Sequence, residues 1–145
     1  MKLTYKGDYA LKAVLDLALH YGHLVTISDL AARAEIPVKF LEQVLLELKR
    51  GGFVESRRGK IGGYLLAKPP SRITVGDVIR FIEGQIEPIA CVNKKYSGCA
   101  DIYKCVFRPL WVDIAKSISL VVDTVTFEDL ANRIKKGKQG LTYNI

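Results

Sequence analysis

Apolar residues recur at helical spacing through the first third of the chain. The pattern predicts helices over residues 8–21, 29–34 and 37–51. Ser28 is placed to cap the second helix, and Pro37 suits the first position of the third, where no backbone N–H is needed. The third helix is expected to turn five apolar side chains toward the core: Phe40, Leu41, Val44, Leu45 and Leu48. Its other faces are polar and free to contact a ligand.

Helical spacing then gives way to two short strand-like runs, over residues 53–56 and 64–67. A basic, glycine-rich stretch, residues 58–63, joins them as a hairpin. Three helices followed by such a hairpin form the outline of a winged helix-turn-helix. In that fold the third helix enters the major groove of DNA, and the hairpin, or wing, reaches along the backbone toward the minor groove.

Two threonine caps mark helices in the second half of the chain. Thr74, with Asp77 three residues on, predicts a capping box that starts a fourth helix, which ends near Gly84. Thr126, with Asp129 three residues on, is expected to cap a last short helix. A polar tail is expected to begin at residue 135.

Between these caps, a long apolar helix is predicted over residues 109–122. Its apolar stripe is too rich for a lone surface helix, so the same helix of a second subunit is expected to cover it. The expected interface residues are Leu110, Trp111, Ile114, Ile118 and Val121. The predicted fold is therefore mainly α, with a winged helix-turn-helix DNA-binding domain over 1–83, a cysteine loop over 84–108, and a dimerisation helix and C-terminal segment over 109–145.

Length and composition narrow the function. The 145 residues suffice for one compact domain and a dimerisation segment but not for two enzymatic domains, and we expect no enzymatic activity. No apolar run approaches the roughly 20 residues that span a bilayer. The N-terminus has no signal-peptide core. A cytoplasmic homodimer without membrane contact is expected.

The positive charge is concentrated where the wing is predicted. The net charge is +7, and residues 49–60 hold five basic side chains against one acid. A charge run is often only a solvated turn, but after a helix-turn-helix pattern we expect it to bind double-stranded DNA. The candidate DNA contacts are Lys39, Glu42, Gln43, Lys49, Arg50, Arg57, Arg58, Gly59 and Lys60. Lys39, Glu42 and Gln43 are expected to read bases, and the wing cations to bind phosphate or the minor groove.

The three cysteines of the chain, Cys91, Cys99 and Cys105, lie close together in the sequence. The residues between the first two are polar, so these thiols have no core to fill. Soft thiolates select iron–sulfur clusters, zinc or copper(I), and a common iron–sulfur cluster needs at least one further ligand. A thiol redox enzyme would want a Cys-x-x-Cys pair or a nearby base, and neither is present.

Four segments of the chain resemble one bacterial regulator family: residues 1–10, 40–43, 58–66 and 74–79. The family includes the iron–sulfur assembly regulator IscR, the nitric-oxide sensor NsrR and the cysteine-metabolism regulator CymR. The resemblance implies a homodimeric winged-helix regulator whose cysteine loop holds an iron–sulfur cluster, expected as 4Fe-4S with 2Fe-2S open. CymR-like members lack the loop cysteines.

The resemblance also bears on the missing ligand. The IscR pattern has a histidine three residues after its last cysteine, where this chain has Arg108, which cannot ligate. NsrR-like members use an acid near the N-terminus of the partner subunit, and that position matches Asp8 here. A first-turn helix acid is the other interpretation of Asp8. Competing ligands are His20, His23, Glu83, Glu87, an external thiol or water.

We therefore predict a sequence-specific transcriptional regulator, expected to be a repressor, that binds a pseudopalindromic operator. It is expected to sense iron–sulfur status, redox state or nitric oxide through a cluster on the three cysteines. The alternative is a cluster-free regulator of cysteine metabolism that responds to thiol oxidation or to an enzyme partner.

Overall fold

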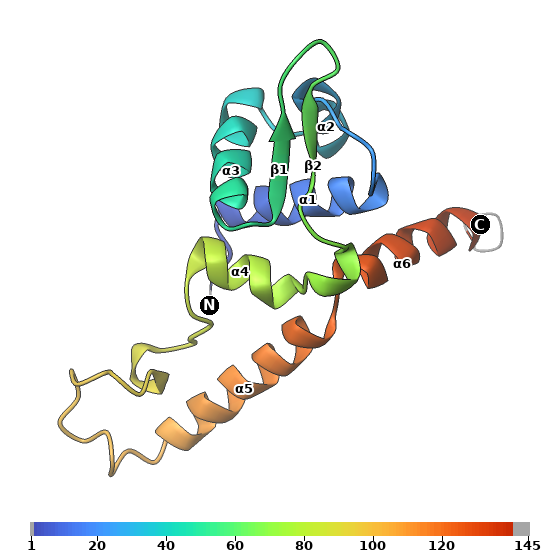
Figure 1. Cartoon of the computed structure of the whole chain (residues 1–145). Coiled ribbons are helices and arrows are strands. Elements are labelled where there is room, and N and C mark those ends of the chain that lie inside the picture. The colour runs from blue at the N-terminus through green and yellow to red at the C-terminus, as the bar shows by residue number, and fades with distance from the viewer. Residues whose placement is uncertain (1, 141–145) are drawn as a thin grey trace.

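Six α-helices and one antiparallel hairpin build the described part of the chain (Figure 1). The structure is a computed structural model that describes residues 2–140. In chain order the elements are α1 (Tyr5–Leu19), α2 (Ile27–Ala34), α3 (Val38–Arg50), β1 (Val54–Arg57), β2 (Gly63–Leu66), α4 (Val75–Glu83), α5 (Arg108–Thr124) and α6 (Phe127–Gly140), with short 3-10 turns at Pro70–Arg72 and Ala90–Val92. This order is the mainly α winged-helix arrangement that the sequence predicts.

The core forms around α1, which packs against α2, α3, α4 and α6. Small side chains on α1 let its neighbours approach closely, because Ala10 and Ala13 are fully buried. On α3 the predicted stripe Leu41, Val44, Leu45 and Leu48 lies inside the core. Burying each of these large side chains stabilises the fold by about 1.5–3 kcal/mol.

The sequence places the starts of the first two helices too late. Helix α1 begins at Tyr5 because Thr4 caps it, accepting from the Gly7 N–H at 3.3 Å. The prediction that Ser28 caps α2 is wrong, since Thr26 accepts from the Asp29 N–H at 3.2 Å. Val25 pairs through its backbone with Tyr64 and is therefore held in an extended conformation. Helix α2 starts directly after this pairing ends.

Two details of α3 also differ. Pro37 is the N-cap rather than the first helical residue. Phe40 is 60% exposed, so its predicted place in the core is wrong. It lies one residue before Leu41, at the edge of the apolar stripe, and its ring faces Tyr9 on α1, with the ring centroids 6.5 Å apart.

The hairpin forms the wing, and its strands pair from Val54↔Leu66 to Arg57↔Gly63. Each strand is shifted by one residue from its predicted position. The capping box of α4 is confirmed: the Thr74 hydroxyl accepts from the Asp77 N–H, and the Asp77 carboxylate accepts from the Thr74 N–H. Gly84 ends this helix with a positive φ of 89°, a conformation that favours glycine.

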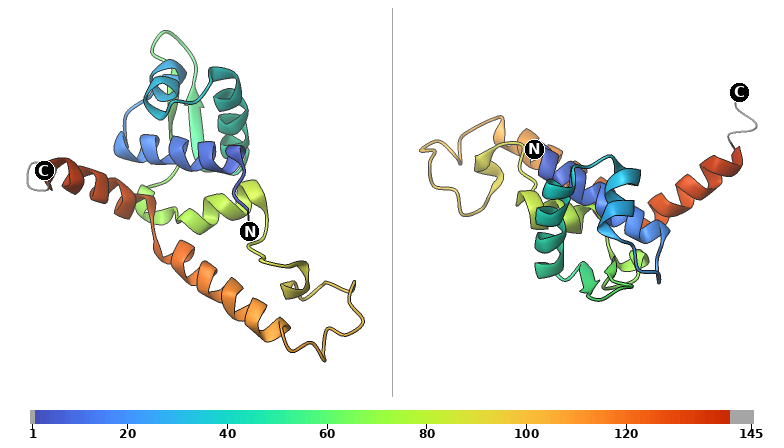
Figure 2. Two further views of the ribbon diagram at one scale, coloured as in Figure 1. Left: turned by 180° about the vertical axis from the view of Figure 1, so that it is seen from behind. Right: turned by 90° about the horizontal axis from the view of Figure 1, so that it is seen from above.

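The C-terminal helices are α5 and α6, and α6 packs on the core through the buried Phe127 and Ala131. The cap of α6 by Thr126 and Asp129 is confirmed. The polar tail expected from residue 135 is wrong, because α6 continues to Gly140. Acids in its first turn and lysines in its later turns suit the helix dipole. The N-terminal end of α5 and the segment before it project away from the body (Figure 1 and Figure 2). Within residues 2–140 no helix is long and apolar enough to cross a membrane.

Candidate DNA interface and cysteine segment

A groove of about 460 Å³ runs between α3 and the wing. It brings together five of the predicted DNA contacts: Glu42, Gln43, Lys49, Arg57 and Arg58. The other four predicted contacts, Lys39, Arg50, Gly59 and Lys60, are exposed but do not line this groove. Sequence reasoning did not single out Leu46, Ser56 and Tyr64, which also line it.

The groove is positively charged and its walls are joined. Lys49 on α3 donates to the Ser56 hydroxyl on β1 at 2.7 Å. Within the described residues, Arg57, Arg58 and Lys60 form no ion pair with an acid. Exposed cations without acidic partners attract a polyanion such as DNA. At the wing tip Gly59 has φ 118°, which favours glycine.

The end of α3 is held by α4. Gly51 follows α3, and a Cβ at this position would lie 2.7 Å from the Phe81 ring of α4. The same ring meets Phe53, the residue before β1, edge-on at 5.5 Å between centroids. Phe81 therefore contacts the junction between α3 and the wing. No pattern in the sequence marked this role of Gly51.

The first two helices are joined by a part-buried ion pair. Arg33 donates from Nε and Nη2 to the two carboxylate oxygens of Asp16, each at 2.9 Å, and Asp16 is only 8% exposed. The hydrogen bond to Asp16 raises the pKa of Arg33 above its ordinary value. This pair fixes α2 against α1 and so sets the base on which α3 rests.

The three cysteines carry free thiols on an irregular segment. Cys99 is exposed, and Cys91 and Cys105 are half-buried. Arg108, at the start of α5, donates to the Cys91 carbonyl at 3.1 Å and so links the two ends of the segment. Among the described residues, no group of three or more His, Cys, Asp or Glu side chains could hold a metal ion as placed. The structure therefore does not bring the three thiols together.

The donor set nevertheless suits an iron–sulfur cluster. Three unpaired thiols supply the soft ligands that iron–sulfur clusters take. The segment carries only one short 3-10 turn, at Ala90–Val92, and tight backbone turns such as Lys104 N–H to the Asp101 carbonyl at 2.9 Å. The thiols can therefore converge without breaking a helix or a sheet.

The candidates for the further ligand have partners of their own. The Asp8 carboxylate pairs with Lys12 at 2.7 Å, and this contact raises the pKa of Lys12. Glu83 accepts from the Thr4 N–H at 2.9 Å and from the Thr4 hydroxyl. Glu87 accepts from the Asn93 amide, and the His20 Nδ1 atom lies 2.8 Å from the Asp16 carbonyl oxygen. His23 is exposed.

Helix α5 presents an apolar surface outward. Of the predicted interface residues, Leu110 and Val121 are 51% and 63% exposed, and Trp111, Ile114 and Ile118 are half-buried. Its C-terminal end is attached to the body through the ion pair of Asp123 with Arg80 of α4 and the Val75 N–H bond to the Val125 carbonyl at 2.9 Å. Ala115, near the middle of the helix, is buried, whereas the N-terminal end of α5 lies away from the body (Figure 1).

Residues 3–133 match the family Rrf2, described as an iron-dependent transcriptional regulator. The HTH-type transcriptional regulator IscR of Yersinia pseudotuberculosis is 38% identical over 133 residues, which cover 91% of this chain and 80% of that protein. Among solved structures, CymR, the global cysteine regulator of B. subtilis, has a TM-score of 0.77 at 33% identity, covering 92% of this chain and 98% of CymR. T. potens IscR has a TM-score of 0.76 at 33% identity, covering 94% and 90%. These names describe transcriptional regulators and not enzymes.

Proposed function

The chain belongs to the Rrf2 family of transcriptional regulators, and from that premise we propose that it is a homodimeric repressor that reads a pseudopalindromic operator. The groove between α3 and the wing carries this proposal, because it places Glu42 and Gln43 beside Arg57 and Arg58. The first two side chains suit base edges in the major groove, and the arginines suit phosphate or the minor groove.

The dimer is proposed to form through α5. An exposed apolar stripe on a helix that stands off the body favours a second copy as its cover. A twofold axis through this helix would present two α3 helices to half-sites one or more helical turns apart. Replacing Ile114 and Ile118 with lysine should abolish both the dimer and operator binding, as measured by sedimentation and by gel shift.

The regulatory ligand is proposed to be an iron–sulfur cluster, expected as 4Fe-4S. Cys91, Cys99 and Cys105 would hold it, with Asp8 of the partner subunit as the further ligand. When bound, the cluster supplies an iron site that reacts with oxygen or nitric oxide. The iron-dependent description of the family and the likeness to IscR support this assignment. Arg108 would hold the start of the cysteine segment on α5 through the Cys91 carbonyl.

A second candidate is a cluster-free regulator of cysteine metabolism. The likeness to CymR, described as a global cysteine regulator, favours it. The exposed thiol of Cys99 could then respond to oxidation directly.

The absorption spectrum of protein purified without oxygen, together with its iron and sulfide content, separates the two candidates. Visible charge-transfer bands that disappear in each Cys→Ala variant are expected. Asp8→Ala should alter the spectrum or shorten the lifetime of the cluster, with Asp101→Ala, on the cysteine segment, as a control. A colourless protein without iron would contradict the cluster and favour the second candidate.

A further inference from the structure

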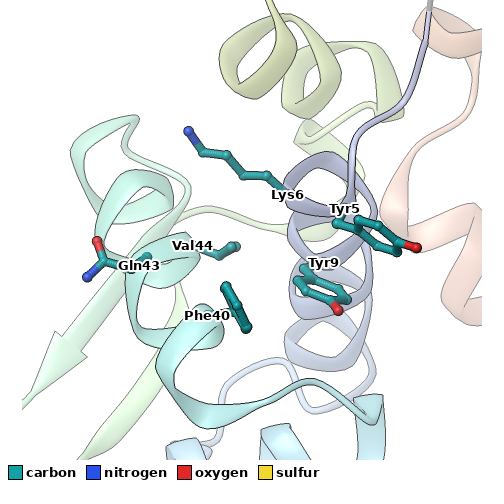
Figure 3. A pocket seen from close by; sticks show the side chains of 6 residues that line it. All are labelled: Tyr5, Lys6, Tyr9, Phe40, Gln43 and Val44. Carbon is teal, nitrogen blue, oxygen red and sulfur yellow. The ribbon is translucent and has the colours of Figure 1, made fainter.

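A pocket of about 380 Å³ lies between α1 and α3, apart from the cysteines (Figure 3). It is lined by Tyr5, Lys6, Tyr9, Phe40, Gln43 and Val44. Its walls are largely aromatic: the Tyr9 ring lies between the Tyr5 and Phe40 rings, with centroid distances of 6.2 and 6.5 Å. The pocket therefore presents mainly apolar ring faces, and the Tyr5 and Tyr9 hydroxyls lie at its outer rim, pointing away from Phe40 (Figure 3).

Core packing does not account for these rings. Tyr5 is 81% exposed and Phe40 is 60% exposed, whereas Val44, at the back of the pocket, is 3% exposed. Leaving two large aromatic side chains in water forgoes the stabilisation that their burial would give. Such a cluster is typical of a surface that another molecule covers.

The pocket and the basic groove lie on opposite flanks of the same helix. The groove lies between α3 and the wing, the pocket lies between α3 and α1, and Gln43 lines both. Figure 3 shows Phe40 and Val44 on the side of α3 that faces α1, with Gln43 pointing away from the rings. An α-helix about 10–12 Å across fills a major groove about 12 Å wide, so each DNA strand must pass along one flank.

We propose that this aromatic pocket binds the sugar–phosphate backbone of the operator strand on the flank of α3 opposite the wing. The Tyr5 and Tyr9 hydroxyls can donate to phosphate oxygens, and the ring faces can pack on deoxyribose. The Lys6 Nζ atom forms an ion pair with the Glu47 carboxylate at 2.7 Å. This pair uses one of the three N–H donors of Lys6 and leaves the others for a phosphate. This inference rests on the proposed DNA-binding function and adds a second strand contact to it.

The choice of a DNA strand follows from continuity and charge. The pocket shares Gln43 with the groove that holds Lys49, Arg57 and Arg58, so an occupant of one lies beside the occupant of the other. The Lys6 ammonium at its edge is paired with Glu47 but keeps N–H donors for a phosphate. Backbone contacts position a protein on the duplex without reading its sequence. The pocket should thus contribute affinity and orientation, and α3 should contribute preference.

The test uses the full-length dimer and an operator that the wild-type protein selects from a randomised duplex pool. The double variant Tyr5→Ala/Phe40→Ala should weaken binding to this operator and to an unrelated duplex by a similar factor, about tenfold. Tyr9→Phe, which removes only a hydroxyl, should weaken both by about threefold. Base preference should be unchanged. Fluorescence anisotropy on both duplexes measures these effects.

Phosphate-ethylation interference shows which phosphates of the operator the pocket contacts. Ethylation of the phosphates on the strand away from the wing should block binding of the wild-type protein. The same ethylation should have no effect on binding of the double variant. Tyr21→Ala is the matched control, because Tyr21 is a 47% exposed aromatic residue outside the pocket. This control should bind and footprint as the wild type does.

Two results would overturn the strand contact while leaving the proposed function in place. In the first, the double variant keeps both its affinity and its ethylation pattern, which would mean that the pocket binds a small ligand or another protein instead of DNA. A lowered melting temperature or an altered base preference would mean that the rings only support α3. A wild-type protein that selects no duplex at all would instead refute the proposed function, and the strand contact with it.

Discussion

The winged-helix body and the cysteine segment differ in what gives them their shape. In the body, α1 and α3 each carry a fully buried stripe, which includes Ala13 and Leu45, and side-chain bonds such as Arg33 to Asp16 join neighbouring helices. Between residues 87 and 114, none is buried. The body therefore has the surface that we propose reads DNA already formed in the single chain. The cysteine segment gains so little from packing that a ligand on its thiols can determine its conformation.

The sharpest contrast between the two regions should appear in stability. Leu45→Ala removes a fully buried side chain and should lower the free energy of unfolding by about 2–5 kcal/mol. Cys99→Ala, on the exposed segment, should change it by less than about 0.5 kcal/mol in cluster-free protein. Urea unfolding measures both, and Leu46→Ala, a 45% exposed neighbour on α3, is the control. Similar losses of unfolding free energy in Leu45→Ala and Cys99→Ala would contradict the difference between the body and the cysteine segment.

The junction at Gly51 tests whether the body is shaped for DNA. Gly51→Ala places a methyl group 2.7 Å from the Phe81 ring, which must move; because Phe81 is 44% exposed and can turn aside, the free energy of unfolding should fall by only about 1 kcal/mol. Operator affinity should fall because α3 shifts relative to the wing. Adding Phe81→Ala should restore much of that affinity. Gly137→Ala is the control, since its Cβ would meet no atom within 4 Å.

A smaller effect is expected from a single wing cation. Arg58→Ala should weaken binding to every duplex and reduce the slope of log K against log salt by about one unit. Lys95→Ala removes an exposed cation from the cysteine segment and should leave both quantities unchanged. Titrations at several salt concentrations measure them. An unaltered slope for Arg58→Ala would refute the wing assignment.

Local signals explain what the sequence predicts well. The caps at Thr74 and Thr126 depend on an acid three residues away, and both form as expected. The groups that join the elements leave no local pattern, because Arg33 and Asp16 are 17 positions apart and Glu83 and Thr4 are 79 apart.

Predictions from the sequence fail at the ends of helices and at the margins of their apolar stripes. The exposure of Phe40 depends on how α3 turns against α1, and the start of α2 depends on the pairing of Val25 with Tyr64. The candidate DNA contacts could be chosen from their charge and their place after the helices. The three cysteines could likewise be chosen as cluster ligands from their residue type, but among the described residues the chain alone does not bring them together, so that prediction stays untested.

The smallest predicted effect concerns the attachment of α5 to the body. Hydrogen bonding to Arg80 lowers the pKa of Asp123 below its ordinary value of 3.8. The pair therefore stabilises the fold fully above that value, and the contribution is lost as the pH falls through the lower folded pKa. Because Asp123 is 41% exposed, the loss should be less than about 1 kcal/mol. Asp123→Asn should remove this acid dependence in melting curves, whereas Asp113→Asn should keep it.

Hydrogen–deuterium exchange tests most directly whether the cysteine segment takes its shape from a cluster while the body does not. The protein is purified without oxygen, and exchange is followed by mass spectrometry before and after a chelator removes the iron. Amides over residues 88–107 should lose protection when the iron is removed, while those of α1, α3 and the wing should remain as protected as before. Equal exchange of the cysteine segment in both forms, or an equal loss of protection in the body, would contradict the account.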